Sequence, residues 1–418
     1  MTINNEHKKL NVPNLRFPEF QGEWKESTIG EMFDLYSGNT PSRLNKEHFK
    51  GTVNWISSGE LKEHYIYSSK EQISEEAAKS LKLLPVGTFV IAIYGLEADG
   101  VRGTGSITQE PSTISQACMS FIPKGVIENE FLYSWYKKHG NVIGIRYAQG
   151  TKQQNLSYDI LEKFRIAYPN TKEQEKLNKF ISLLDERIAT QNKIIEDLKK
   201  LKSAIIEKVF CSPNQKNPMC RIEGFEQALS TYKMSDFSSR IATKNKDSKC
   251  SLVLTIAAQY GLVNQESFFN KSVASKNLTG YYLLHKGEFA YNRSYSAGYD
   301  WGAVKRLDNY DEGVLSTLYI CFKINETIVD SDYLTYYFES TKWHRGLSDI
   351  AGEGARNHGL LNVSITDYFN TKHRFPVIEE QKAIAKMLNT ITEKERKATL
   401  LGECYQKQKQ YLLRQMFI

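Results

Sequence analysis

Several glycine-containing loops carry side chains of the types that can contact nucleic acids. Arginine can donate two hydrogen bonds to guanine, asparagine and glutamine can pair with adenine, and lysine and serine can hold phosphates. Glycine lets a backbone approach a duplex closely. Loops of this composition are usually solvated turns, but here they recur in both halves of the chain. Four lie in the first half and two in the second, at residues 36–43, 54–60, 94–105, 146–155, 291–302 and 351–359.

The candidate contacts are the side chains in these loops that can donate hydrogen bonds or stack on bases. In the first half they are Arg43, Ser57, Arg102, Lys152, Gln153 and Gln154. In the second half they are Arg293, Tyr295, Trp301, Arg356, Asn357 and His358. The predicted chemistry is hydrogen bonding to bases and phosphates.

Motifs for covalent or metal-assisted catalysis are missing from the sequence. It contains no N-P-P-[YF] or D-P-P-[YF] tetrapeptide, no G-x-x-x-x-G-K-[ST] and no H-E-x-x-H. The glycines of 100–105 have the wrong order for a dinucleotide loop and indicate a turn. The acidic pair at 379–380 lies in the first turn of an expected helix, where it complements the helix dipole. We therefore predict no catalytic, cofactor-binding or metal-binding residue in this chain.

Composition limits the class of protein. The chain has 418 residues, of which 40% are apolar and 12% aromatic, enough for two to three domains. A net charge of +7 permits a nucleic-acid partner without requiring one. Its six cysteines form no C-x-x-C pair and are expected to be reduced thiols. Without a leader-like or membrane-spanning apolar segment, we expect a cytoplasmic protein that does not bind membranes.

An internal repeat organises the chain. Pro169 and Pro376 lie 207 positions apart, and the same offset relates Gln174 to Gln381 and Phe210 to Phe417. Upstream the offset falls to 202 and then to about 200, where the sequences also diverge. A period this long indicates a duplicated domain and not a solenoid.

Each repeat is expected to consist of a mixed α/β body followed by a long helix. Short apolar runs rich in β-branched and aromatic residues predict strands, and segments with helical spacing alternate with them. The expected order is a tail at 1–20, a first body at 21–171, a helix at 172–210, a linker at 211–220, a second body at 221–378 and a helix at 379–418.

The two long helices are predicted to pair with each other. Each has about 37 residues and is therefore about 55 Å long, more than a single body can cover. If the linker turns the chain back, the helices lie antiparallel as a coiled coil about a pseudo-twofold axis, with one body near each end. The alternative is that each helix packs only on its own body. The predicted pairing residues are Leu177, Ile181, Leu184, Ile188, Ile195, Leu198, Ile384, Leu388, Ile391, Tyr405 and Leu412.

These features together resemble the DNA specificity subunit (HsdS) of type I restriction-modification systems. The resemblance rests on SGNTPS at 37–42, on the segment 150–188 that closes the first repeat, and on GARNHGLLNVSITDYF followed by FPVIEEQKAIAKML in the second. It covers essentially the whole chain beyond the N-terminal tail. The second body departs from the pattern, with SSRIATKN at 238–245 where SGNTPS would be expected.

The resemblance implies that each body is a target-recognition domain that reads one half of a split, asymmetric site in double-stranded DNA. The helices would set the separation of the half-sites and dock two modification subunits. Those partners would use S-adenosylmethionine to methylate adenine at N6, and restriction subunits bound through them would use ATP and Mg²⁺. This chain would be a non-catalytic part of a bacterial defence system.

One alternative belongs to a different class. A structural or bridging protein could pair its helices and bind protein or glycan ligands through its two bodies. That hypothesis predicts no salt dependence of DNA affinity, whereas DNA binding through phosphates weakens steeply as salt rises. A third hypothesis is an enzyme with an unrecognised site.

Overall fold

The computed structural model describes residues 11–418 apart from 99, 151, 272–273, 276, 295–297 and 351–360. The chain forms two compact units. The first contains residues 1–192 and 400–418, and the second contains residues 193–399. The boundary crosses both long helices, so each unit combines one α/β body with part of each helix.

A five-stranded sheet is the centre of the first body. Its strand order is β2 (Phe33–Ser37), β9 (Cys118–Pro123), β6 (Phe89–Ala92), β7 (Gly105–Thr108) and β4 (Tyr65–Ile66). Every residue of β6 is buried, as expected for a central strand covered on both faces. Helix α3 (Asn129–Tyr147) packs on the sheet through aromatic side chains, with the Phe89 and Tyr133 rings 5.9 Å apart.

A smaller sheet extends the first body. It consists of β5 (Glu71–Ile73), β3 (Val53–Ile56) and β8 (Ser112–Ile114), with β3 and β8 parallel. Three short helical segments accompany it: η1 (Lys46–Phe49), η2 (Ser58–Glu60) and α2 (Glu75–Ala78). Trp55 and Ile73 form a separate small core beneath this sheet.

The second body repeats the main sheet of the first. Its order is β12 (Ser238–Arg240), β19 (Ile320–Ile324), β16 (Phe289–Asn292) and β17 (Ala303–Arg306), which matches β2, β9, β6 and β7. The register agrees as well, because Phe89 lies opposite Phe121 and Phe289 opposite Phe322. The repeat inferred from the sequence is therefore a structural repeat.

Other elements of the second body have partial counterparts. Helix α8 (Ser331–Tyr337) takes the place of α3 and is followed by α9 (His344–Ser348). Beside the sheet lie η3 (Lys246–Ser248), α7 (Gln265–Phe269) and two antiparallel pairs, the hairpin of β13 (Leu254–Ala257) with β14 (Gly261–Asn264), and β15 (Tyr282–His285) with β18 (Glu312–Leu315).

A short two-stranded ladder leads into each long helix. In the first unit β1 (Lys25–Thr28) pairs with β10 (Arg165–Tyr168), and in the second β11 (Ser230–Lys233) pairs with β20 (Lys372–Phe375). Each ladder is accompanied by two short helices, α1 (Ile29–Met32) and α4 (Tyr158–Leu161) in the first unit, and α6 (Met234–Phe237) and α10 (Ile365–Asn370) in the second.

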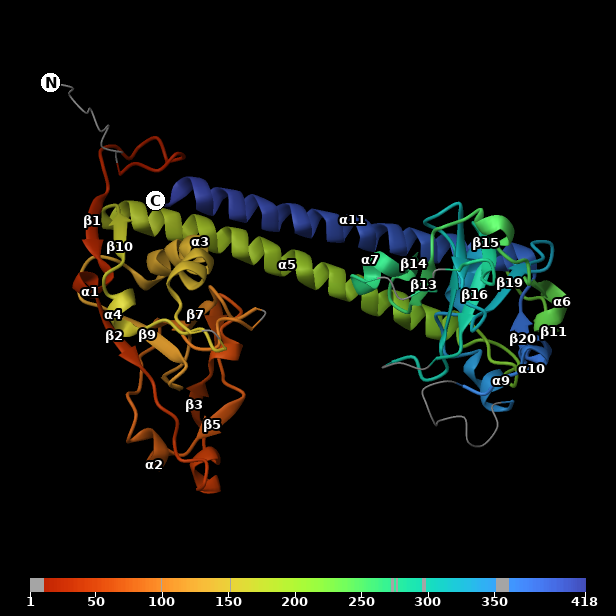
Figure 1. Ribbon diagram of the computed structural model, residues 1–418, viewed down its shortest axis with the longest axis horizontal. Coiled ribbons are helices and arrows are strands. Elements are labelled where there is room, and N and C mark those ends of the chain that lie inside the picture. Colours follow the sequence, from red (N-terminus) through yellow and green to blue (C-terminus); the bar gives the residue numbers. More distant parts are fainter. Residues whose placement is uncertain are drawn as a thin grey trace. The chain divides into compact units, whose positions relative to one another are not determined.

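The long helices α5 (Thr171–Val209) and α11 (Ile378–Met416) lie side by side within each unit (Figure 1). In the first unit Asp185 bonds Lys409, and the Arg187 guanidinium lies 4.5 Å from the centre of the Tyr405 ring. In the second unit Lys202 bonds Glu395 at 2.8 Å. Within the first unit the paired numbers rise in α5 and fall in α11, so the helices run antiparallel there.

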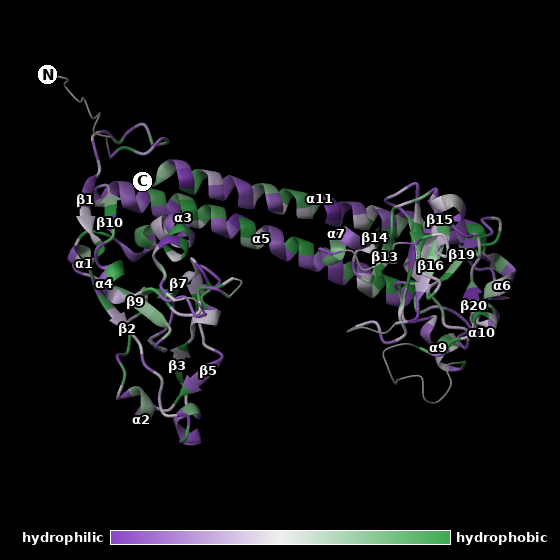
Figure 2. Cartoon of the chain, viewed as in Figure 1, coloured by the Kyte–Doolittle hydropathy of each residue, from purple (hydrophilic) through white to green (hydrophobic). Residues whose placement is uncertain are grey.

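The helix surfaces alternate between polar and apolar residues, as Figure 2 shows by colour. Of the predicted pairing residues, the buried ones are Leu177, Ile181, Ile188, Ile384 and Leu388, and the half-buried ones are Leu184, Ile195, Leu198, Ile391, Tyr405 and Leu412.

Each body is closed by the end of the helix from the other repeat. Phe417, after α11, is buried in the first core with its ring 5.2 Å from that of Phe131. Phe210, after α5, is buried in the second core with its ring 5.0 Å from that of Tyr333. Each helix therefore packs on its own body, on the other helix and in the core of the other body.

The Glu-Gln pair that recurs at the start of each helix ties three segments together. Gln381 accepts a hydrogen bond from the Asp330 backbone at 2.9 Å and donates to the Ile328 and Pro376 carbonyls, both at 3.0 Å. Gln174 makes the same three bonds in the first unit. The preceding Glu380 pairs with Arg221. The acidic residues were predicted only to complement the helix dipole, but Glu380 also anchors the chain entering the body.

We predict that Gln381→Ala destabilises the second unit by about 1 to 3 kcal/mol, because it leaves buried backbone groups unpaired. Urea denaturation followed by tryptophan fluorescence measures the change, and Gln408→Ala, on an exposed part of the same helix, is the control. Equal midpoints for the two variants would show that the Gln381 amide is dispensable.

Candidate nucleic-acid interface

Two of the predicted loops form one continuous surface in the first unit. The segment after α3 folds back on itself, with hydrogen bonds of 2.8 and 2.9 Å between the backbones of Gln149 and Asn155. It is joined to the chain leaving β6 by bonds from Leu156 to the Ile93 carbonyl and from Leu96 to the Gln154 carbonyl. Loops 94–105 and 146–155 are therefore held together.

Arg102 and Gln154, both predicted contacts, touch each other on this surface. The Arg102 guanidinium donates to the Gln154 side-chain oxygen at 2.9 Å, and the Gln154 backbone N–H donates to Glu97 at 2.8 Å. The Arg102 stem lies over Gly144 of α3, where a Cβ would collide with it. Arg102 thus orients the Gln154 amide, whereas the neighbouring Lys152 side chain is exposed.

A cavity of about 480 Å³ opens beside these loops. Its polar lining includes Ser37, Gln149 and Gln153, and two partly exposed tyrosines, Tyr94 and Tyr158, also border it. Amides can hydrogen bond to base edges and tyrosine rings can stack on bases. Sequence reasoning selected Gln153 but missed Tyr94, Gln149 and Tyr158. Their position in or beside a glycine-amide loop is the signal that could have identified them.

Two other predicted residues of the first body are already engaged within the protein. Arg43 bonds both oxygens of Glu71 at 2.8 and 2.7 Å, and its guanidinium lies 4.4 Å from the centre of the Phe49 ring. The hydrogen bond from Arg43 lowers the pKa of Glu71. The Ser57 hydroxyl donates to Glu60 at 2.6 Å. Contact of Arg43 or Ser57 with DNA stays a prediction.

The predicted residues of the second body are spread over several environments. The Arg293 guanidinium donates to the Leu318 carbonyl at 3.1 and 3.3 Å and to the Val363 carbonyl at 3.1 Å, which ties two loops together. Trp301 is half-buried against the second core. Tyr295, Arg356, Asn357 and His358 lie outside the described residues.

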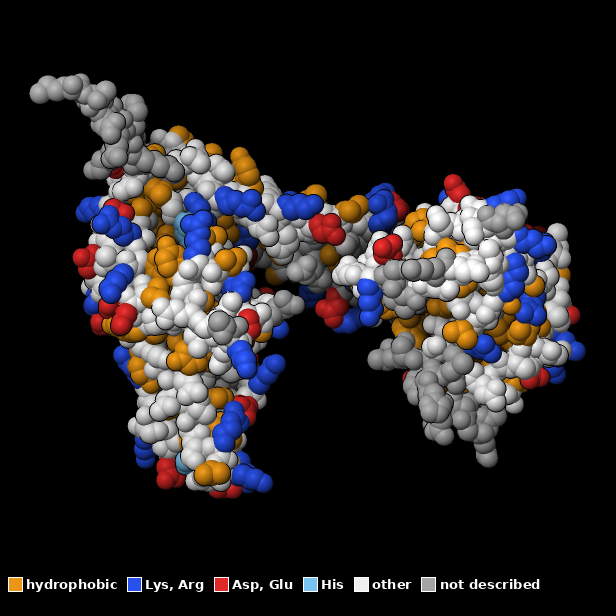
Figure 3. Space-filling model, viewed as in Figure 1, with side chains coloured by type: hydrophobic (Ala, Val, Ile, Leu, Met, Phe, Trp, Pro, Cys, Tyr) orange, Lys and Arg blue, Asp and Glu red, His pale blue; other side chains and the backbone are white. Residues whose placement is uncertain are grey.

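The surface charge of the first unit is mixed. On the visible face, Lys and Arg side chains are interspersed with Asp and Glu (Figure 3). Within the described ranges, no helix is long and apolar enough to cross a membrane, and no three His, Cys, Asp or Glu side chains are grouped to hold a metal ion.

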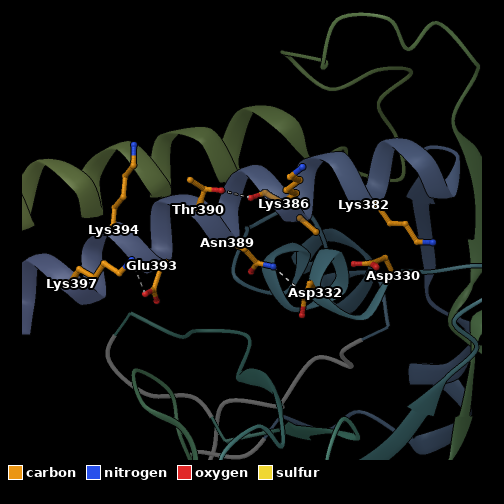
Figure 4. A pocket seen from close by; sticks show the side chains of 10 residues that line it. Asp330, Asp332, Lys382, Lys386, Asn389, Thr390, Glu393, Lys394 and Lys397 are labelled. Atoms are coloured by element: carbon orange, nitrogen blue, oxygen red, sulfur yellow. Dashed lines mark hydrogen bonds and ion pairs between the residues drawn. The ribbon is translucent and has the colours of Figure 1, made fainter.

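A polar groove of about 580 Å³ runs along α11 in the second unit. Its lining includes Lys382, Lys386, Lys394 and Lys397 of α11, and Figure 4 shows Asp330 and Asp332, from the start of α8, beside this helix. Asp332 accepts a bond from Asn389 at 2.8 Å. Lys382, Lys386 and Lys394 have no carboxylate partner among the residues that the structure describes, so the groove offers unpaired positive charge.

The chain is similar to known proteins in sequence. Residues 21–200 match the family model described as the type I restriction modification DNA specificity domain. The specificity subunit of the type I restriction enzyme MjaIX from Methanocaldococcus jannaschii is 28% identical over 194 residues, which are 45% of this chain and 44% of that protein. The EcoR124I/EcoR124II specificity subunit from Escherichia coli is 32% identical over 189 residues, 44% of this chain and 45% of that protein. The matched part therefore spans less than half the length of either relative.

Two solved structures share the fold along most of the chain. The S subunit of a type I restriction-modification system from M. genitalium has a TM-score of 0.56 and 16% identity, and the match covers 97% of this chain and 99% of that chain. A second structure, described as the structural basis of complex assembly and conformational transition of the type I R-M system, contains a chain with a TM-score of 0.55 and 13% identity. The match covers 93% of this chain and 96% of that chain.

We predict that Gly150→Ala disrupts the loop at 146–155. Gly150 has φ of +112°, which is unfavourable for alanine, and an added Cβ would collide with the Gln153 carbonyl oxygen. Limited proteolysis should cleave this loop faster in the variant than in the parent protein. Gly59→Ala is the control, since its Cβ would meet nothing within 4 Å. Unchanged cleavage in Gly150→Ala would contradict the expected strain.

Proposed function

Because residues 21–200 match the type I restriction modification DNA specificity domain, we propose that this chain is a DNA specificity subunit of that family and reads a bipartite, asymmetric DNA target with one body per half-site. In this proposal the chain performs no chemistry of its own. It directs an adenine-N6 methyltransferase, and through it the restriction and translocation subunits, to the chosen sequence. Its proposed place of action is the cytoplasm.

The observation that carries this proposal is a duplicated scaffold with unlike loops. The two main sheets share their strand order and register, so each body can present its loops in an equivalent way. The loops differ in sequence, and the three-stranded sheet of the first body is only partly repeated in the second, where β13 pairs with β14 and a single parallel bridge joins Val253 to Val314 of β18. Equivalent scaffolds with different reading surfaces suit two different half-sites.

The proposed reading surface of the first body is the joined pair of loops at 94–105 and 146–155. Gln153 lines the cavity there, Gln154 is oriented by Arg102, and the exposed Lys152 is the proposed phosphate contact. Tyr94 and Tyr158 supply stacking area at the cavity. In this proposal phosphate binding lies beside base recognition, as DNA readers require.

We further propose that α5 and α11 set the spacing between the half-sites. Each helix has 39 residues and passes from one unit into the other. At about 1.5 Å per residue each is about 58 Å long, which exceeds the roughly 34 Å of one turn of B-DNA.

The proposed partners are two modification subunits, with restriction subunits bound through them. S-adenosylmethionine, ATP and Mg²⁺ would be bound by those partners. The groove along α11 is a candidate docking surface for a modification subunit because its unpaired lysines can attract carboxylates of another protein.

The test of the proposed function compares the methylated-adenine motif in host DNA with the gene present and deleted. DNA carrying that motif is then titrated with the purified chain and its modification subunits. Changing either half-site should weaken binding, and affinity should fall steeply as salt rises. A single contiguous motif would contradict the proposal, and salt-independent binding would favour a bridging protein with protein or glycan ligands.

In the same titration, Gln153→Ala should weaken binding by about 1 to 3 kcal/mol if Gln153 contacts a base, and only the first half-site should lose specificity. Gln410→Ala, on an exposed part of α11, serves as the control. An equal loss on all DNA sequences would assign Gln153 to the phosphate backbone instead.

For the docking groove, the double charge reversal Lys382→Glu with Lys386→Glu should weaken the affinity for the modification subunit at least about tenfold, or about 1.4 kcal/mol. Analytical ultracentrifugation of the mixed proteins measures this change. Lys407→Glu, elsewhere on the exposed surface of α11, should leave the affinity unchanged. Equal weakening by both variants would exclude a specific role for the groove.

A further inference from the structure

His64 lies in the first unit with both ring nitrogens bonded to carboxylates. Nε2 is 2.8 Å from a Glu130 oxygen and Nδ1 is 3.1 Å from an Asp185 oxygen. A neutral imidazole has only one N–H to donate. Two ionised carboxylates at these distances therefore require the imidazolium form of His64.

The imidazole is also enclosed between two tyrosine rings. The Tyr65 ring lies parallel to it with centroids 4.1 Å apart, and the Tyr133 ring does so on the other face at 3.9 Å. The His64 side chain is 10% exposed. Aromatic faces on both sides attract a cation, so the stacking favours the same protonated form.

The His64 contacts link the sheet to both long helices. The His64 carbonyl accepts a bond from Ile107 of β7 at 2.8 Å, next to the edge strand β4. Its ring reaches Glu130 on α3 and Asp185 on α5, and the second oxygen of Asp185 bonds Lys409 on α11. One imidazole therefore connects the body to both long helices, in addition to the contacts of Gln174 and Phe417. The candidate DNA contacts are carried by the same body.

The second unit makes the equivalent connection without a histidine. Thr392, which lies 207 positions after Asp185, bonds the hydroxyl of Tyr336 at 2.9 Å. Tyr336 is on α8 as Tyr133 is on α3, and it also donates to Asn389 at 2.8 Å. The ionic contacts nearby, Arg306 with Asp332 and Lys202 with Glu395, pair strong bases with carboxylates. Such pairs keep their charges across neutral pH.

We propose that His64 is a positioning residue whose imidazolium fixes the first body on α5 and α11, and that reading of the first half-site, unlike that of the second, therefore depends on pH. The part concerning DNA rests on the proposed function. The fixing of the body to the helices does not.

The direction of the pH effect follows from the groups around the ring. These are Glu63 and Tyr65 on its own segment, Glu130, Tyr133 and Lys137 on α3, Asp185 on α5, and Lys409 on α11. Burial alone would lower the pKa of His64, but the hydrogen bonds to Asp185 and Glu130 raise it above its ordinary value of 6.5. The stabilisation is therefore fully present below pH 6.5 and is lost as pH rises through the raised pKa.

Lys137 has the opposite effect at higher pH. Burial and the neighbouring Lys409 lower its pKa to about 8. Its ammonium disfavours the folded state at low pH, and this penalty is relieved as the pH rises above about 8. The contribution of His64 is therefore measured below about pH 8, and Lys137→Met removes the opposing group.

The first experiment is hydrogen exchange of the full chain between about pH 6 and pH 8, corrected for the intrinsic pH dependence of exchange. The opening equilibrium of peptides covering 57–67 and 129–137 should increase as pH rises. The total increase should be up to about tenfold for each unit by which the folded pKa of His64 exceeds 6.5. Peptides covering 331–337 should not open more readily as pH rises, because Tyr337 bonds His373, whose pKa is lowered to about 3 by burial, so that neutral His373 stabilises this segment at higher pH. In His64→Gln the peptides covering 57–67 and 129–137 should exchange quickly at every pH. Asp185→Thr introduces the residue found at the equivalent position 392 of the second unit and should remove the pH dependence.

The second experiment measures discrimination of each half-site over the same pH range. Discrimination of the first half-site should fall as pH rises and that of the second should not, and His64→Gln should abolish the pH effect. Tyr336→Phe is the matched variant and should weaken the second half-site equally at all pH values.

The outcomes separate the two levels of the proposal. Exchange that is independent of pH, or equally dependent in both units, overturns the role of His64. If hydrogen exchange of the first unit depends on pH but discrimination of the first half-site does not, His64 does not position the DNA-contacting loops of that body. If no sequence-specific binding is found at any pH, the proposed function fails and the exchange data still decide whether His64 fixes the body to the helices.

Discussion

The structure depends on one reciprocal packing arrangement. Phe417 fills the core of the first body and Phe210 fills the core of the second, so each repeat completes the other. Burial of a phenylalanine side chain contributes about 1.5 to 3 kcal/mol. Neither body has a complete core without the final turn of the helix from the other repeat. The folding of one unit is thereby linked to the presence of both helices.

This arrangement explains why the helix segments match at one constant offset while the bodies diverge. Along its length α5 contacts its own body near one end, α11 in the middle and the other body near its other end. Most positions of the helix are therefore constrained by packing. The Glu-Gln pairs at positions 173–174 and 380–381 are under the same constraint, because each is buried and bonds three segments. A loop that contacts only its own body is free of this constraint, so its sequence can diverge between the repeats.

The two units also differ in how each body is fixed to the helices. The first uses an ionic group in which His64 joins Glu130 and Asp185, and the second uses the neutral contacts of Tyr336 with Asn389 and Thr392. Buried ions need complete pairing because an unpaired charge is costly in a low-dielectric environment. An ionic group of this kind is sensitive to protonation, whereas hydroxyl and amide contacts are not.

The sequence by itself determined the duplication, the α/β class and the two long helices, because these follow from local periodicity and from a constant offset between repeats. It also identified loops that the structure joins, such as those containing Arg102 and Gln154. Only the tertiary structure decided which side chains meet. The structure pairs Arg43 with Glu71 and bonds Arg293 to backbone carbonyls, while their contact with DNA stays a prediction. His64 was not identified from the sequence, although it bonds Asp185 from 121 positions away. Contacts between residues so distant in sequence have no periodic signature, since they depend on how the sheet and helices pack and not on the spacing of residues along the chain.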